Sequence, residues 1–282
     1  MLFKGFGFFS LIMFLNCNSL FYYPNKKIYS TPEEYNLKYE DIFFQSKDGT
    51  KLHGWFIYAK EQSKLKGTII QFHGNAQNLT SHYRSLVWLT EHGYNLFTFD
   101  YRGYGKSEGD IDKTGIREDA KAALEYIRNI PQKKKGKQTI IYGQSLGGIK
   151  AIDAFLSFQE KEWVSCVIIE SSFASYQKIA EDRLSQSFIT WPFQFLVFLL
   201  VSEEGSVEDK IIDISPVPLI VIHGQKDNTV PFEFGTDIFK RAIKPKHIIE
   251  IPEGGHINSF MVNDGKYKET FLRIIDKTLK IQ

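Results

Sequence analysis

Residues 139–148 read TIIYGQSLGG and contain the pattern Gly-x-Ser-x-Gly at Gly143, Ser145 and Gly147. The apolar run before the serine predicts a buried strand, and the spacing after it predicts a helix over Leu146–Phe158. Between such a strand and helix the turn is so tight that side chains at the flanking glycine positions would collide with neighbouring backbone. The turn lifts the hydroxyl to the helix N-terminus, where partial positive charge favours a developing anion. We therefore predict that Ser145 is a nucleophile.

Outward from this turn, short apolar segments alternate with amphipathic ones. The predicted strands are Thr68–Phe72, Leu96–Phe99, Thr139–Tyr142, Cys166–Ile169, Leu219–Ile222 and His247–Ile251. The predicted helices are Leu79–His92, Ile116–Ile130, Leu146–Phe158, Phe232–Ile243 and Tyr267–Leu279. Ile42–Gln45 and Leu52–Tyr58 flank a turn signal at residues 47–50, which predicts an antiparallel hairpin. Continuous apolar strands are typical of parallel sheets, so the pattern indicates a doubly wound α/β sheet with the hairpin at one edge.

A serine nucleophile needs a base, and the base needs a carboxylate to orient it. In hydrolases with this turn the chain order is serine, acid, histidine. The strand Leu219–Ile222 leads into a loop with Asp227, and the next strand leads into His256. We predict Asp227 as the acid and His256 as the base, because they complete that order at strand ends, where ligands bind in this class of fold.

Other acids and histidines fit this order less well. Asp100 follows an earlier strand, and Asp213 and Asp264 lie outside the expected turns. His73 and His223 each precede a glycine at a strand end. We interpret these two histidines as packed, hydrogen-bonded turn residues.

The tetrahedral intermediate of such a reaction needs two N–H donors at its oxyanion. The backbone of Leu146, directly after the serine, is the first predicted donor. The second is predicted in the loop after the strand Thr68–Phe72, which reads HGNA. There the N–H of Asn75 is our first choice, with Ala76 in reserve, because Gly74 lets the backbone come close.

Several of these segments together resemble the α/β-hydrolase superfamily, over about residue 22 to the C-terminus. They are residues 72–76, 100–107 and 143–148, the Asp227 loop and Gly255-His256. Residues 31–35 and 48–55 are similar to a membrane-anchored branch that includes eukaryotic depalmitoylating serine hydrolases and many bacterial proteins. The resemblance implies a mostly parallel eight-stranded sheet with helices on both faces and a short helical lid insert at about 173–215. It also implies an ester or thioester hydrolase, and a structural role for the loop that holds Arg102.

The first 16 residues read as a targeting segment. Lys4 precedes an apolar run from Phe6 to Leu15, which is too short to span a bilayer and suits a secretory signal. Cys17 after this run resembles the lipidated cysteine of a bacterial lipoprotein. Two other interpretations stay open: an uncut anchor over the uncharged stretch Gly5–Tyr23, or an incidental cysteine. We expect residues 1–16 to be a signal or anchor, 17–38 a tether and 39–282 the hydrolase domain. We also expect the protein to be held at a membrane on its extracytoplasmic side, through a lipid anchor or an uncleaved signal anchor.

Composition excludes other classes of function. Thirty-five Lys and Arg against 33 Asp and Glu give a net charge of +2, which offers no footprint for nucleic acid. Two cysteines cannot form a disulfide framework, and the seven dispersed histidines form no metal motif. Because no nucleotide-binding loop is present either, we expect neither a cofactor nor a metal. The expected partner is a small-molecule or acyl substrate, and the sequence does not indicate an oligomeric state.

Residues 189–201, ITWPFQFLVFLLV, carry no charge and interrupt the strand–helix alternation. With an internal proline and only 13 residues they cannot span a membrane, so they form either a core helix or an apolar lid. A lid would favour lipid or acyl substrates of an esterase or thioesterase. The alternatives are a serine peptidase or amidase of the same fold, and a membrane-tethered binding protein without catalysis.

Overall fold

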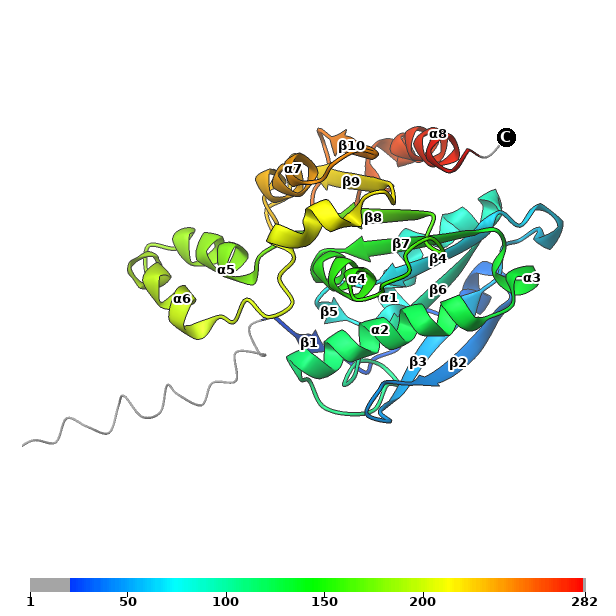
Figure 1. Cartoon of the computed structure of the whole chain (residues 1–282), viewed down its shortest axis with the longest axis horizontal. Helices are drawn as coiled ribbons and strands as arrows, with labels where there is room; N and C mark the ends of the chain where they lie inside the picture. The colour runs from blue at the N-terminus through cyan, green and yellow to red at the C-terminus, as the bar shows by residue number, and fades with distance from the viewer. Residues whose placement is uncertain (1–20, 281–282) are drawn as a thin grey trace, which may run out of the picture.

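The computed structural model describes residues 21–280, in which eight strands form one sheet in the order β10-β9-β8-β7-β4-β6-β3-β2 (Figure 1). The strands are β2 (Tyr39–Gln45), β3 (Lys51–Ile57), β4 (Gly67–Phe72), β6 (Tyr94–Asp100), β7 (Gln138–Gln144), β8 (Cys166–Glu170), β9 (Leu219–Gly224) and β10 (Lys246–Ile251). The pairs β2–β3 and β3–β6 are antiparallel, and all other pairs in this sheet are parallel. The mostly parallel eight-stranded sheet with a hairpin at its edge is therefore confirmed.

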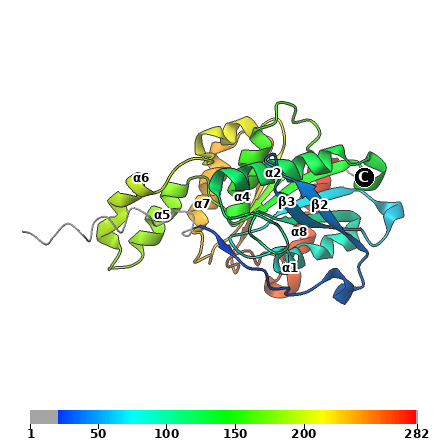
Figure 2. The same ribbon diagram turned by 90° about the horizontal axis from the view of Figure 1, so that it is seen from below.

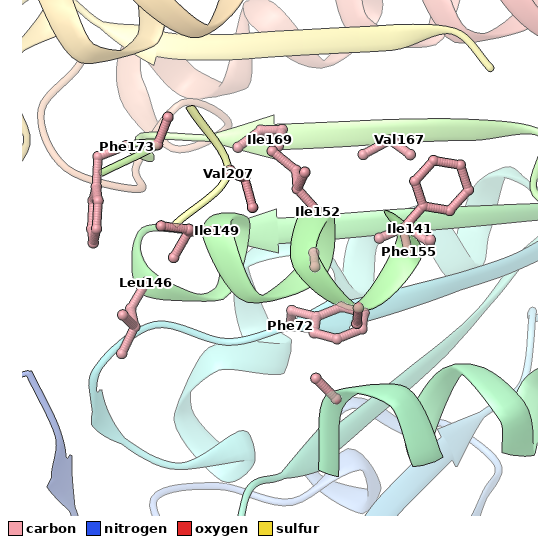
Figure 3. Close-up of a cluster of buried hydrophobic side chains, with 14 of the residues drawn as sticks. Phe72, Ile141, Leu146, Ile149, Ile152, Phe155, Val167, Ile169, Phe173 and Val207 are labelled. Atoms are coloured by element: carbon pink, nitrogen blue, oxygen red, sulfur yellow. The ribbon is translucent and has the colours of Figure 1, made fainter. Parts of the chain in front are cut away.

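Helices cover both faces of this sheet (Figures 1 and 2). The longer ones are α2 (Lys113–Asn129), α4 (Leu146–Leu156), α5 (Tyr176–Ser185), α7 (Phe232–Arg241) and α8 (Tyr267–Leu279), and the short ones are α1 (Leu79–His82), α3 (Gln132–Lys135) and α6 (Val197–Leu200). Neighbouring residues of one strand belong to different cores: Ile141 packs with α2 and α4 (Figure 3), whereas Ile140 packs with α8. This two-sided burial is the reason for the continuous apolar runs in the sequence.

The predicted helix over residues 79–92 is wrong in its form. The chain makes α1 and then two 3₁₀ turns, Tyr83–Ser85 and Val87–His92. The side chains of Gln71 and Ser85 donate to the carbonyl of His82, each at 2.9 Å, where an α-helix would place the amide of Leu86. That amide bonds the carbonyl of Tyr83 instead, at 3.1 Å. Side-chain competition for one carbonyl thus tightens the helix.

The insert at residues 173–215 contains α5, the 3₁₀ turn Trp191–Leu196, α6 and the 3₁₀ turn Glu208–Ile214. Helices α5 and α6 stand out from one end of the molecule in both views (Figures 1 and 2). No helix within residues 21–280 is both long and apolar enough to cross a bilayer.

The described part of the expected tether packs on the domain. Strand β1 (Tyr23–Pro24) pairs in parallel with β5 (Ala76–Gln77) in a separate two-stranded sheet. Tyr22 and Leu37 are buried, and Asn25 accepts a hydrogen bond from the amide of Gly105 at 3.0 Å. We call residues 21–30 the strap, because they run across the loops at the carboxyl ends of the strands. Residues 1–16 and Cys17 lie outside the described residues.

Candidate active site

Ser145 lies at the tight turn between β7 and α4, with φ 53° and ψ −123°. A left-handed φ at a residue with a side chain costs about 1–3 kcal/mol, and such strain is concentrated at functional sites. A Cβ at Gly143 would lie 2.5 Å from the Cα of Gly148, and one at Gly147 would lie 2.1 Å from the carbonyl oxygen of Phe72. Both contacts are with backbone, so the turn requires glycine at both positions.

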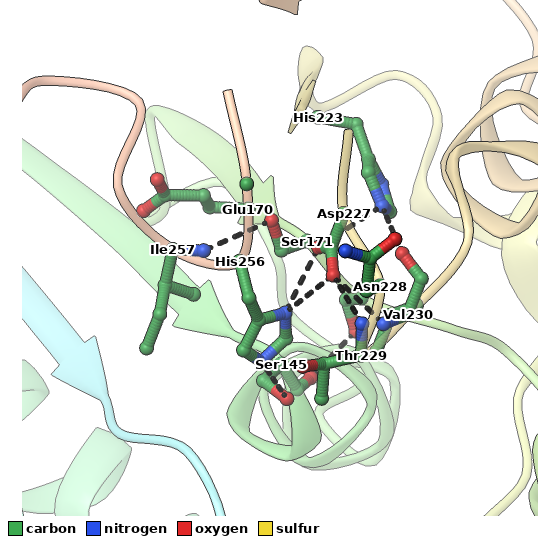
Figure 4. A network of polar contacts seen from close by, with 12 residues as sticks. Ser145, Glu170, Ser171, His223, Asp227, Asn228, Thr229, Val230, His256 and Ile257 are labelled. Carbon is green, nitrogen blue, oxygen red and sulfur yellow. Dashed lines mark hydrogen bonds and ion pairs between the residues drawn. The ribbon is translucent and has the colours of Figure 1, made fainter. Parts of the chain in front are cut away.

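Ser145, His256 and Asp227 form one hydrogen-bonded chain (Figure 4). The Nδ1 atom of His256 lies 2.9 Å from Oδ2 of Asp227, and its Nε2 atom lies 3.0 Å from Oγ of Ser145. An ionised carboxylate only accepts hydrogen bonds, so Nδ1 carries the proton and Nε2 of the neutral ring is an acceptor. The Ser145 hydroxyl therefore donates to Nε2, which is the arrangement needed to remove its proton.

The loop after β9 holds Asp227 in place. Its Oδ1 accepts hydrogen bonds from the backbone amides of Thr229 at 2.8 Å and Val230 at 2.9 Å, and the side chain is buried. Burial alone would raise the pKa of Asp227, but the bonds from His256 and the two amides bring that pKa below its usual range. The carboxylate is thus kept ionised beside the imidazole.

Three further contacts fix the loop that carries His256, and sequence reasoning did not find them. The amide of Gly255 donates to Oδ1 of Asn258 at 2.8 Å. The amide of Ile257 donates to Oγ of Ser171 at 3.3 Å (Figure 4), and the amide of Ser259 donates to Oε1 of Glu170 at 3.2 Å. Glu170 ends β8 and Ser171 follows it, so their position at a strand end was the available signal.

Side chains on other elements set the peptide planes of the loop after β4. His73 Nδ1 lies 2.7 Å from the carbonyl oxygen of Gly74 and donates to it, which orients the plane that carries the Asn75 N–H. The Tyr104 hydroxyl donates to the carbonyl of Asn75 at 2.6 Å, which orients the plane that carries the Ala76 N–H. Asn75 and Leu146 both line the same cavity as Ser145.

The strap is the third support of this loop. The amide of Tyr23 donates to Oδ1 of Asn75 at 2.9 Å, next to the pairing of β1 with β5. His82, which we did not single out in the sequence, donates through Nε2 to the carbonyl of Ala76 at 2.8 Å. Burial, with the nearby His73 and His256, lowers the pKa of His82 to about 3, so this ring stays neutral at physiological pH.

A cavity of about 930 Å³ opens over Ser145 and His256. Phe21, Phe173, Ile179, Leu196 and Val197 contribute to its mostly apolar wall, and Arg183 is the one side chain with a fixed charge among the described lining residues. No Asp or Glu of the described chain lines it. The space therefore fits an apolar chain and offers no carboxylate to a cationic group. A second cavity, of about 640 Å³, includes neither Ser145 nor His256.

The rival residues lie elsewhere. Asp100 accepts the amide of Leu79 at 2.7 Å and shapes the loop after β6. His73 and His223 are buried, and Nε2 of His223 donates to the carbonyl of Val230 at 2.8 Å, so both are packed turn residues as expected. Arg102 pairs with Asp119 at 2.8 Å, in keeping with a structural role. Cys166 is buried in β8, and residues 21–280 contain no group of three or more potential metal ligands.

The sheet, the strained serine turn and the hydrogen-bonded chain define a serine hydrolase of the α/β fold. A family profile described as "Serine aminopeptidase, S33" matches residues 63–208. The chain belongs to this family and, with it, to the α/β-hydrolase superfamily.

Full-length relatives support this assignment. The chain is 35% identical over 267 residues to the uncharacterized protein YfhR of Escherichia coli K12, covering 94% of this chain and 89% of that protein. It is 32% identical over 260 residues to the α/β-hydrolase domain-containing protein WAV2 of Arabidopsis thaliana, covering 88% and 82%. Among solved structures, an esterase of Pyrococcus furiosus superposes with a TM-score of 0.71 at 20% identity, covering 92% of this chain and 98% of the esterase. At that identity the likeness concerns the fold alone.

Proposed function

We propose that the protein hydrolyses carboxylic ester or thioester bonds through an acyl-enzyme on Ser145. Oγ of Ser145 attacks the carbonyl carbon while Nε2 of His256 takes the hydroxyl proton. Asp227 holds the imidazole in the tautomer described above and stabilises its charged form. The backbone N–H groups of Leu146 and Asn75 bind the oxyanion of the tetrahedral intermediate.

The cycle closes without a cofactor. His256 gives its proton to the departing alkoxide or thiolate, which leaves as the alcohol or thiol, and the acyl group stays on Ser145. Water then attacks the acyl carbonyl as His256 takes a proton from it. The carboxylic acid leaves, and the proton returns to Oγ of Ser145. The observation that carries this proposal is the chain from Ser145 through His256 to Asp227 beneath an apolar cavity.

An aminopeptidase is the second candidate, because the family's description names one. Such an enzyme must bind the free ammonium group of a peptide, and buried cations in proteins are paired with carboxylates. The absence of Asp and Glu from the described cavity lining, together with Arg183 in it, favours a neutral acyl chain over an ammonium group.

We also propose that the N-terminal segment holds the enzyme at a membrane, on the extracytoplasmic side, with lipidation of Cys17 as the candidate mechanism. Incorporation of labelled palmitate into the wild type and into Cys17→Ser tests that mechanism. Equal incorporation would rule out Cys17 and leave the uncharged stretch before the strap as the candidate attachment.

A fluorophosphonate probe followed by substrate series tests the activity. Wild type should be labelled and Ser145→Ala, which changes one atom in a buried turn, should not. Hydrolysis of p-nitrophenyl esters should exceed hydrolysis of aminoacyl p-nitroanilides at equal concentration. An unlabelled wild type, or labelling that persists in Ser145→Ala, would refute the mechanism, and a preference for aminoacyl anilides would favour the peptidase.

A further inference from the structure

The insert presents a surface of large apolar side chains to solvent. Residues 184–202 contain no Asp, Glu, Lys or Arg. Phe188 is 94% exposed, Ile189 and Leu199 are each 78% exposed, and Trp191, Phe195 and Phe198 are exposed by more than half. We call these six residues the apolar face. Large apolar side chains that are exposed together on one segment mark an interaction site.

The segment that carries the apolar face also lines the cavity above Ser145, through side chains that point inward. Leu196, Val197 and Val201 contribute to the cavity wall, and Val197 and Val201 are buried. Exposed and cavity-lining side chains alternate because successive residues of the Trp191–Leu196 turn and of α6 point to different sides of the helix. One thin layer of chain therefore separates the space above Ser145 from whatever contacts the apolar face.

The N-terminal segment is attached at this end of the molecule. Phe21, the first described residue, packs edge-on against Tyr176 of α5 with ring centroids 5.2 Å apart. Phe21 and Tyr23 line the same cavity as α5 and α6. The sequence from Gly5 to Tyr23 has no charged residue, so the most apolar stretch of the N-terminus is covalently joined beside the insert.

Charge distinguishes the occupants of such a surface. Over residues 173–215 the insert has three Lys and Arg against seven Asp and Glu, so attraction to an anionic partner cannot drive contact. The apolar face itself offers burial of Phe, Trp and Leu side chains, which are the groups that enter the interface of a bilayer. A bilayer is also the partner proposed above for the uncharged N-terminal segment, which joins the domain at Phe21 beside the insert.

We propose that the apolar face docks into the interfacial layer of a lipid bilayer and opens the cavity above Ser145 toward that layer. The enzyme then takes its acyl substrate from the membrane. The docking is driven by apolar burial and needs no anionic lipid. The substrate part of this proposal rests on the proposed hydrolase function, whereas the docking does not.

Trp191 is an internal reporter of docking, because the other three tryptophans, Trp55, Trp88 and Trp163, are buried or half-buried. Full-length protein is reconstituted into phosphatidylcholine vesicles with brominated acyl chains, which quench tryptophan by contact. We expect quenching in the wild type that is lost in Trp191→Phe, and that is no stronger in anionic than in zwitterionic vesicles. Equal quenching of wild type and Trp191→Phe would overturn the docking.

The double variant Phe198→Ser/Leu199→Ser removes two side chains of the apolar face that do not line the cavity. Its Trp191 quenching should fall by at least roughly half, and its hydrolysis of long-chain esters in vesicles should fall by a similar factor. Its hydrolysis of a short soluble ester should not change. The matched control Phe43→Ser/Ile243→Ser replaces two exposed apolar residues outside the insert and should leave all three readouts unchanged.

Two outcomes separate the failures. If the wild type shows no fluorophosphonate labelling but Trp191 is quenched, the proposed function fails and the docking stands. If Phe198→Ser/Leu199→Ser converts a dimer to a monomer in sedimentation while Trp191 of the wild type is not quenched, the apolar face binds a second copy, and the docking proposal is overturned.

Discussion

Replacement of Asp227 by asparagine should remove activity while the fold is kept, and the structure shows why. Oδ1 of Asp227 accepts two backbone amides, those of Thr229 and Val230. An asparagine at 227 must place its side-chain oxygen where Oδ1 lies now, because an NH₂ group at that point would face the two backbone N–H donors. The NH₂ group therefore takes the place of Oδ2, which lies 2.9 Å from Nδ1 of His256.

In this orientation the amide donates to Nδ1, and the ring proton moves to Nε2. Nε2–H then points at Oγ of Ser145, 3.0 Å away, and the ring can no longer accept the serine proton. The loss expected from the wrong tautomer is on the order of 10³–10⁴ in kcat, or about 4–5 kcal/mol of transition-state stabilisation. The folded state keeps both backbone hydrogen bonds, so the free energy of unfolding at neutral pH should change far less.

The assay compares kcat for a soluble p-nitrophenyl ester and the rate of fluorophosphonate labelling in the wild type, Asp227→Asn and Asp100→Asn. Asp100 is the matched control, a buried aspartate at the end of β6 that also accepts a backbone amide. Both rates should collapse together in Asp227→Asn alone. If Asp227→Asn keeps a kcat within tenfold of the wild type while its unfolding transition is unchanged, the tautomer argument and the role of Asp227 are refuted.

Three further perturbations test other parts of the site. Gly147→Ala places a Cβ 2.1 Å from a backbone oxygen of β4 and should lower the free energy of unfolding by about 3 kcal/mol or more in urea titrations; Gly74→Ala, whose Cβ would meet no atom closer than 3.5 Å, should cost clearly less. Tyr104→Phe removes the hydroxyl that donates to the carbonyl of Asn75 and so orients the plane that carries the Ala76 N–H. Because Asn75 supplies the proposed donor, kcat should change by less than about threefold, and a loss of roughly tenfold or more with little change in KM would assign the oxyanion donor to Ala76 instead. Burial lowers the pKa of Lys150 to about 7, so between pH 7 and 9 the unfolded chain binds the extra proton and stability should rise with pH. Lys150→Met should flatten that rise in denaturation series, and parallel curves would contradict the assignment.

The central part of the fold could be predicted because its signals are local. An apolar run such as Ile140–Tyr142 is buried on both sheet faces, so its composition alone indicates a parallel strand. The chain order of Ser145, Asp227 and His256 follows from strand ends that share one edge of the sheet. Those three residues were therefore predicted together, and the structure brings their side chains into hydrogen-bonding contact.

What sequence reasoning missed depends on contacts between segments far apart in the chain. Gln71 interrupts the predicted helix by donating to the carbonyl of His82. The spacing of apolar residues in the sequence gives no sign of such a bond. Glu170 and Ser171 hold the backbone of the His256 loop from almost ninety residues away. A backbone amide is present at nearly every residue, so a side chain that bonds one leaves no mark on the residue types of the segment it contacts. Such hydrogen bonds can therefore be found only in the three-dimensional structure.

The strap shows how far this matters for function. We expected residues 17–38 to be a tether that only spans the distance between the N-terminal segment and the domain. Its described part instead contributes hydrogen bonds to the loop that carries Asn75. Tyr22 is buried against Lys150 of α4, with the ammonium 5.5 Å from the ring centroid, so the strap is fastened to the helix that begins after Ser145. The segment that leads to the N-terminus therefore belongs to the site. A substitution at Tyr22 or Tyr23 would therefore disturb the loop that carries Asn75 as well as the strap itself.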